Sequence, residues 1–120
     1  MKIKDAVAMA KMMKPCAFDD TLLIFWISQL EGKIAVDIFH MAPDEAEQFR
    51  YTENDGETET LVKYPHDDLY VQWLAAKIDE ANGEYDKYMN QMEIYNRYYN
   101  NFARWFLQTY EPANGYLRRD

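Results

Sequence analysis

The chain is poor in features that secreted and membrane proteins depend on. It contains a single cysteine, Cys16, so no disulfide can form within it. That fits a reducing compartment and excludes a disulfide-stapled secreted scaffold. No apolar run reaches the roughly 18 residues that a membrane-spanning helix requires. The lysine-rich start, MKIKDAVAMAKMMK, lacks the apolar core of a signal peptide. We therefore expect no membrane partner.

Basic residues are also scarce, with 13 lysines and arginines against 21 acids and a net charge of −8. The imbalance belongs to the middle of the chain. Residues 41–68 carry nine acids against two bases, a net charge of −7, whereas residues 1–40 carry five of each. A segment of this charge repels phosphate, so we expect no nucleic-acid binding through a basic surface. The simplest interpretation of residues 41–68 is an acidic loop that is exposed to solvent.

The most informative pattern is an apolar stripe at alternating steps of three and four residues. Only a helix produces this spacing, since strands alternate every two residues. At about 1.5 Å per residue, a continuous helix over 71–106 would be roughly 50 Å long. The stripe keeps its phase through Asn82 and Gly83, which argues against a turn there. We expect one long helix with a kink or short break at 82–91. The stripe consists of Val71, Leu74, Ile78, Ala81, Tyr85, Tyr88, Met92, Tyr95, Tyr99, Phe102 and Phe106.

Two further helices are expected before this stripe. Residues Ile3 to Met13 repeat at helical spacing, and a second helix runs from about Asp20 to His40. The second helix is apolar on more than one side, so it requires more than one neighbour. Gly32 inside it costs about 1 kcal/mol relative to alanine, which indicates close packing or a kink. The predicted fold class is all-α, a small bundle of about four helices in a single domain, 1–120.

The acidic segment 41–64 lies between the second and third helical regions. Asn54-Asp55-Gly56 is a strong turn signal, and its flanks have some β character, so a long loop and a short hairpin both remain open. We expect the segment to be mobile unless a partner orders it, because an isolated hairpin is marginal in water. Pro112 ends the last helix and leaves a short tail, 112–120.

The sequence favours neither a metal site nor a catalytic site. A calcium loop with Gly56 at its glycine position would begin at Tyr51 and end at Val62, and neither side chain can supply the calcium ligand required there. Neither His40 nor His66 follows a glutamate by three residues, as a di-iron bundle requires. The Asp37–His40 pair is expected to be a surface pair.

Cys16 has no convincing base nearby and is expected to pack in the connector after the first helix. No paired carboxylate lies on a visibly apolar face that would raise its pKa. The four glycines form no phosphate-binding loop. We therefore expect no enzyme and no cofactor.

Seven aromatic residues of the last helix form the candidate interaction surface. They suit either a base-stacking platform or a core or subunit interface, and the negative charge favours the second. Tyrosine suits a half-wet contact, because its hydroxyl needs a partner or water. The seven are Tyr88, Tyr95, Tyr98, Tyr99, Phe102, Trp105 and Phe106.

The stretch YPHDDLYVQWLAAKIDEANGEYDKYMNQMEIYNRYYNNFARWF, residues 64–106, resembles the head–tail connector (adaptor, head-completion) family of bacteriophages and prophages. The likeness lies in a proline, an acidic helix start with Leu69-Tyr70, the run Ala76-Lys77-Ile78-Asp79, and Asn82-Gly83-Glu84-Tyr85 before an aromatic helix. Residues 19–37 fit the preceding helix of that family, and 41–63 falls where the family has a variable loop.

The resemblance implies a structural virion protein at the head–tail interface, present in the bacterial cytoplasm during assembly. About a dozen copies would form a ring that binds the portal protein, receives the downstream connector or stopper protein and extends the DNA channel. DNA would pass without specific binding. Acidic walls would favour that passage, since they repel phosphate. The middle acids, or Asp79, Glu80 and Glu84, are the expected channel-facing residues.

A second class of function is compatible with the same residues. The heptad stripe would support a coiled-coil dimer, and the acidity would suit a mimic of DNA. The alternative is therefore a small dimeric helical regulator or an acidic DNA-mimic inhibitor. A ring subunit is expected to be a monomer in dilute solution, and a regulator to be a stable dimer.

Overall fold

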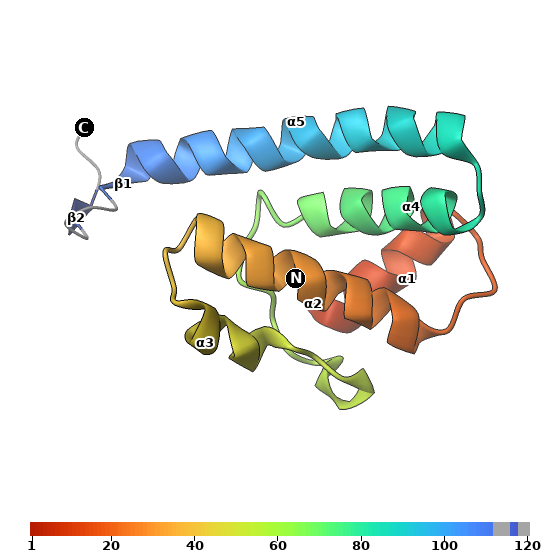
Figure 1. The fold of residues 1–120 in the computed structure, drawn as a ribbon, viewed down its shortest axis with the longest axis horizontal. Coiled ribbons are helices and arrows are strands. Elements are labelled where there is room, and N and C mark those ends of the chain that lie inside the picture. Colours follow the sequence, from red (N-terminus) through yellow and green to blue (C-terminus); the bar gives the residue numbers. More distant parts are fainter. Residues whose placement is uncertain (112–115, 118–120) are drawn as a thin grey trace.

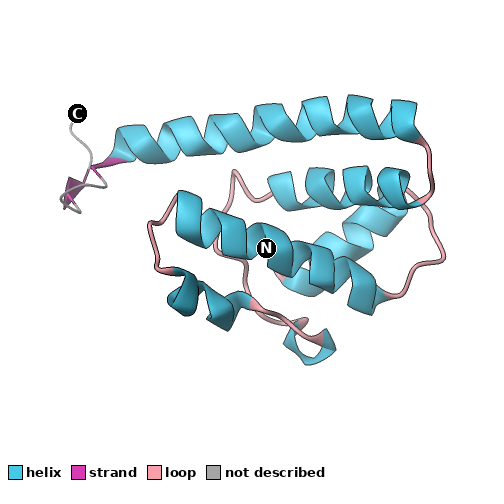
Figure 2. Ribbon diagram, in the orientation of Figure 1, coloured by secondary structure: helices cyan, strands magenta, loops and turns pink. Residues whose placement is uncertain are grey.

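The computed structural model describes residues 1–111 and 116–117, and the side chains of residues 1–109. It confirms the predicted all-α class, with helices linked by loops and one minimal hairpin at the end (Figure 2). The elements are α1 (Ile3–Met13), α2 (Asp20–Asp37), α3 (Pro43–Ala46), the 3-10 helices η1 (Glu47–Phe49) and η2 (Glu53–Asp55), α4 (Leu69–Ala81), α5 (Tyr85–Thr109), β1 (Tyr110–Glu111) and β2 (Tyr116–Leu117).

Helix α4 lies at the centre of the bundle. It contacts α1 and α2 on one side and α5 on the other (Figure 1). Buried residues therefore occur around most of its circumference, including Leu69, Val71 and Ala75. Helices α1 and α2 complete the core with faces spaced at three and four residues. Their buried apolar residues are Ile3, Ala6, Val7 and Ala10 from α1, and Leu23, Ile24, Trp26, Ile27, Leu30, Ile34 and Ala35 from α2.

The chain reverses direction between α4 and α5. The break at 82–84 falls within the predicted range 82–91, but the expectation of one long helix without a turn at Gly83 is wrong. Helix α4 ends at Ala81, and Gly83 adopts a φ of 73°. The Glu84 amide donates to the Asp79 carbonyl at 3.0 Å, and the Gly83 amide donates to the Glu80 carbonyl at 3.0 Å. These two bonds form a Schellman C-cap, which requires a left-handed residue that glycine adopts without strain. Helix α5 then packs antiparallel along α4 (Figure 1).

The acidic segment contains no hairpin, so that alternative for 41–64 is wrong. Its structure is α3 followed by η1 and η2, and its described β contact is a single antiparallel bridge from Glu59 to Lys2. Backbone bonds attach the segment to α1, where the Ile3 amide donates to Thr58 at 3.0 Å and the Lys4 amide donates to Gly56 at 2.9 Å. Of the tail expected at 112–120, Tyr116 and Leu117 form β2, which pairs antiparallel with β1, and 112–115 and 118–120 lie outside the described residues.

No helix among the described residues has the length and apolarity needed to cross a membrane. Cys16 is half-buried and packs against the core from the connector between α1 and α2, as predicted. Helix α2 ends at Asp37, earlier than the expected His40. His40 instead has a φ of 59°, which places it in the turn that leads toward α3.

Candidate interaction surfaces

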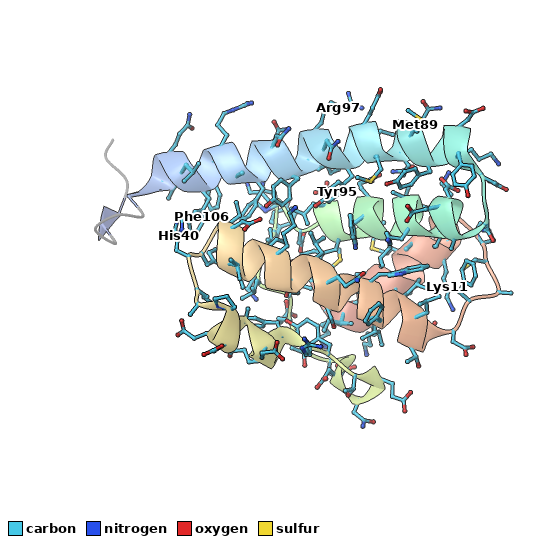
Figure 3. All side chains as sticks on the ribbon, viewed as in Figure 1. Lys11, His40, Met89, Tyr95, Arg97 and Phe106 are labelled. Carbon is cyan, nitrogen blue, oxygen red and sulfur yellow. The ribbon has the colours of Figure 1, made fainter. Side chains whose placement is uncertain are left out.

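The predicted aromatic surface of α5 divides between the core and the exterior. Tyr95 is 5% exposed and Phe102 is 2% exposed, so both belong to the core of this chain and neither offers a free interface. Figure 3 shows Tyr95 directed from α5 toward α4, where its ring centroid lies 5.2 Å from that of Trp73. Burial raises the pKa of the Tyr95 hydroxyl above its ordinary value. Tyr88, Tyr98, Tyr99 and Phe106 are half-buried.

An aromatic cluster forms where the last turns of α5 meet the end of α2 and the loop before α4. We call Phe39, His66, Phe102, Trp105 and Phe106 the aromatic end. Phe39 and Phe106 have ring centroids 4.9 Å apart, and His66 lies 4.9 Å from Trp105 at an interplanar angle of 34°. Trp105 remains 44% exposed. A partly exposed tryptophan on a rigid cluster is typical of an interface anchor.

Sequence reasoning identified the α5 members of the aromatic end and missed the contribution of His66. His66 belongs to another segment, and its separation from Trp105 in the sequence carries no periodic signal. Its position follows from the turn at Gly83, which brings the end of α5 back beside the start of α4.

The three predicted channel acids occupy different environments. Asp79 is 2% exposed, and its Oδ2 lies 3.0 Å from Lys14 Nζ, so the prediction that it faces a channel is wrong. Its carboxylate joins the end of α4 to the end of α1. Glu80 pairs with Lys77 at 3.1 Å, and Glu84 pairs with Lys87 at 3.0 Å. Both remain on the surface with their charge locally balanced.

Several acids of the middle segment are also neutralised by the start of the chain. Glu57 forms ion pairs with Lys4 and with Lys2, the latter at 2.9 Å. Hydrogen bonds from these two ammonium groups lower the pKa of the Glu57 carboxyl to about 2. The uneven charge of the sequence therefore becomes attraction between two segments when the chain folds.

A groove of about 450 Å³ lies between α2 and the α3–η1 turn. Its α2 wall is formed by Phe25, Gln29, Gly32 and Val36, which follow one face of the helix at steps of three and four. Phe25 is 53% exposed. A Cβ added at Gly32 would meet no atom within 4 Å, so the predicted close packing at Gly32 is absent from the described chain. The groove explains why α2 is apolar on more than one side.

The charges of the groove come from three residues. Lys33 lies on α2, and Glu47 and Arg50 lie on the opposite wall. Arg50 Nε is 2.6 Å from Glu47 Oε1, which balances that pair. Lys33 forms no ion pair with a described residue. The groove therefore presents one net positive charge on a strongly acidic protein.

Glu31 lies beneath the groove, on the buried side of α2. Its Oε2 accepts hydrogen bonds from the Tyr51 hydroxyl at 2.8 Å and the Leu61 amide at 2.9 Å, and its Oε1 accepts one from the Tyr70 hydroxyl. The Tyr70 oxygen in turn accepts from the Val62 amide at 3.0 Å. One carboxylate thus holds the segment 51–62 to both α2 and α4.

Burial raises the pKa of Glu31, with the three donors acting in the opposite direction. Glu31 is a single carboxylate, so the sequence-based search for paired carboxylates did not find it. Glu31 sits between Leu30 and Gly32 with no local sequence signal of its role, because its partners are 20 to 39 residues away. Glu31 and Tyr70 are fully buried, and their hydrogen bonds fasten separate segments together.

Among the described residues, no three metal-ligating side chains gather into a cluster. Asp37 and His40 are both exposed, as expected for a surface pair. Two surfaces of the described residues, the aromatic end and the α2 groove, combine partly exposed apolar side chains with polar ones. No family model, curated protein or solved structure matches this chain.

Proposed function

We propose that this chain is a structural subunit of a ring in the head–tail connector of a bacteriophage or prophage. The observation that carries the proposal is the presence of unlike apolar surfaces on different elements: the aromatic end, the α2 groove, and the face of α5 that carries the exposed Tyr85 and Met89. A subunit that joins its neighbours head to tail needs two different surfaces, whereas a two-fold dimer uses one surface twice. The resemblance of residues 64–106 to connector proteins supports the same conclusion, since those residues form the α4–α5 hairpin.

In this proposal the aromatic end meets the portal protein. Trp105 supplies the exposed ring, and His66, Phe102 and Phe106 hold it in place. Tryptophan is among the residues most enriched at the energetic centres of interfaces. The opposite side of each ring would receive the downstream connector or stopper protein. The protein binds and positions its partners in this role, without catalysis or cofactor.

The DNA channel would be lined by acids that have no basic partner in the subunit. Asp44 and Glu45 on α3 are exposed and form no ion pair with a described residue. Since Asp79 is buried and Glu80 and Glu84 are paired, the acids of α3 suit this role better. Repulsion of phosphate keeps DNA from adhering to the wall as it passes.

The test is a mass measurement in solution, alone and with a purified phage portal protein. We expect a monomer in dilute solution and a ring of about a dozen copies on the portal, visible by electron microscopy. Trp105→Ala should weaken portal binding about tenfold or more, in the range of an interface anchor. The control is Leu107→Ala, which removes a side chain that is 51% exposed and should change binding by less than about threefold. Absence of any complex with the portal would overturn the proposal.

The dimeric regulator remains an outcome of the same measurement. The heptad stripe that suggested a coiled-coil dimer packs within the α4–α5 hairpin, except at the exposed Ala81 and Tyr85, so it does not offer a continuous dimer seam. The acidity still suits a DNA mimic. A stable dimer at micromolar concentration, with no affinity for the portal, would favour the regulator.

A further inference from the structure

We infer that the α2 groove binds the outer face of the first half of α5 from a neighbouring copy. The inference rests on the proposed ring and names the contact that joins its subunits. The groove and the outer face of α5 lie on opposite sides of the molecule, separated by α4 and the core (Figure 1). Two surfaces placed in this way cannot satisfy one another within a chain. They are suited to a head-to-tail contact between chains.

The outer face of α5 presents apolar side chains that the fold leaves uncovered. Tyr85 is 66% exposed and Met89, one helical turn later, is 64% exposed. Figure 3 shows Met89 directed away from α4. A flexible methionine adapts to irregular cavities, and a tyrosine suits a half-wet contact. Together they offer a short apolar ridge to a partner.

The floor of the groove allows such a ridge to approach closely. Gly32 has no side chain, and a Cβ there would meet nothing within 4 Å. Glycine inside a helix costs about 1 kcal/mol relative to alanine, and no contact within the described chain uses the space it leaves. A second helix can therefore lie against α2 at this point, flanked by Phe25 and Val36.

Charge complementarity selects α5 as the occupant. Asp86 and Glu93 lie on the outer face of its first half, and neither forms an ion pair with a described residue. Lys33 is the unpaired charge of the groove. The second half of the same face carries Arg97 and Arg104, which Lys33 would repel. The contact is therefore expected near Met89, with Glu93 beside Lys33.

Cross-linking between two variants tests the contact directly. Gln29→Cys and Met89→Cys are made separately in a Cys16→Ser background and mixed in equal amounts on the purified portal protein. Gln29 lines the groove. The control pairs Gln29→Cys with Met12→Cys, since Met12 is 80% exposed and lies on α1. We expect the Met89 pair to form its disulfide at least tenfold faster than the control pair. Equal rates would overturn the inference.

Variants of charge and shape provide the second measurement. Lys33→Glu and Glu93→Lys should each weaken self-association at least tenfold, and their combination should restore it. Gly32→Leu should block assembly by filling the groove, whereas Gly32→Ala should preserve it. Helix propensity rises in both glycine variants, so a loss of assembly will not reflect a loss of fold.

The outcomes distinguish this contact from the ring itself. If rings form on the portal while the cross-link is unselective and charge exchange restores nothing, the contact is wrong and the proposed function stands. If the chain neither binds the portal nor associates with itself, the proposed function and the contact are both overturned.

Discussion

Removal of a single hydroxyl, in Tyr70→Phe, tests whether the Glu31 network holds the acidic segment to the bundle. Tyr70 is fully buried, and its hydroxyl takes part in two hydrogen bonds. It donates to the Glu31 carboxylate and accepts from the Val62 amide at 3.0 Å. The phenylalanine keeps the ring in place, so the change removes these two bonds and little else.

The expected loss of stability follows from those two bonds. A hydrogen bond to a charged group contributes about 1.5–3 kcal/mol, and a buried amide left without an acceptor costs about 1–3 kcal/mol. The two effects overlap because they share one oxygen, so we expect a loss of about 3 kcal/mol. For a domain of this size, that corresponds to a fall in Tm of roughly 10 °C.

Urea denaturation, monitored by the circular dichroism signal of the helices, measures the free energy of unfolding. The matched control is Tyr64→Phe, since Tyr64 is 87% exposed and its variant should stay within about 0.5 kcal/mol of the parent. A loss below about 1 kcal/mol in Tyr70→Phe would refute the network as described. An unchanged denaturant slope is required for the comparison, because a change in slope would mean that the unfolded or native state had altered.

Three further sets of variants test other features of the fold. Burial raises the pKa of Glu31 above its ordinary value of 4.5, so ionisation opposes folding. The stability that is present below pH 4.5 should therefore fall as the pH rises through the raised pKa. Glu31→Gln should remove that fall, and the difference in urea midpoint between parent and variant across pH measures it; parallel pH profiles would contradict the raised pKa. Gly83→Ala should lower stability by about 1 kcal/mol because alanine is strained at a φ of 73°. Gly32→Ala should raise stability by about 0.5–1 kcal/mol, because the added Cβ meets open space. Thermal melts that shift the Tm of both variants in the same direction would contradict these two glycine environments. Asp79→Asn removes the buried charged partner of Lys14, whose side chain is 27% exposed. We expect the free energy of unfolding to fall by about 1–2 kcal/mol after allowance for solvent screening. A Lys14→Met, Asp79→Asn double variant that loses less stability than the sum of the two single variants would confirm that the two side chains are coupled.

Local pattern accounts for the helices themselves. The apolar spacing in 3–13, 20–37 and 71–106 arises from the geometry of the helix, which places residues three and four apart on one face. The all-α class and the first helix were therefore confirmed, whereas the second helix ends at Asp37 instead of His40 and the stripe of 71–106 is divided between two helices. The excess apolar surface of the second helix was also visible, and the groove occupies part of it.

The same pattern failed at the turn for a geometric reason. Ala81 and Tyr85 are four residues apart, which is the step that a continuous helix takes from one turn to the next. A connection of three residues, 82–84, therefore preserves the phase of the stripe even though the chain reverses. The glycine at position 83 was the better signal, since its left-handed φ terminates a helix.

Composition likewise does not predict where the charged side chains lie in the fold. The acids of the middle segment formed one block in the sequence, and folding placed Glu57 against Lys2 and Lys4. Asp79 and Glu31 are ordinary acids by their neighbours in the chain, and folding buried both. An ion pair or a buried hydrogen bond depends on distances between segments, and no local pattern encodes those distances.

By itself, the sequence determined which residues form helices and which faces are apolar, because both follow from interactions over three to four residues. Only the tertiary structure decided which faces meet. It placed α5 along α4, so that the two halves of the stripe pack against each other. It also assembled the aromatic end from three segments and left the groove of α2 open. The physical reason is that the hydrophobic effect is non-directional. The apolar periodicity predicts that one face of a helix will be buried, and the turns between helices decide which segment buries it.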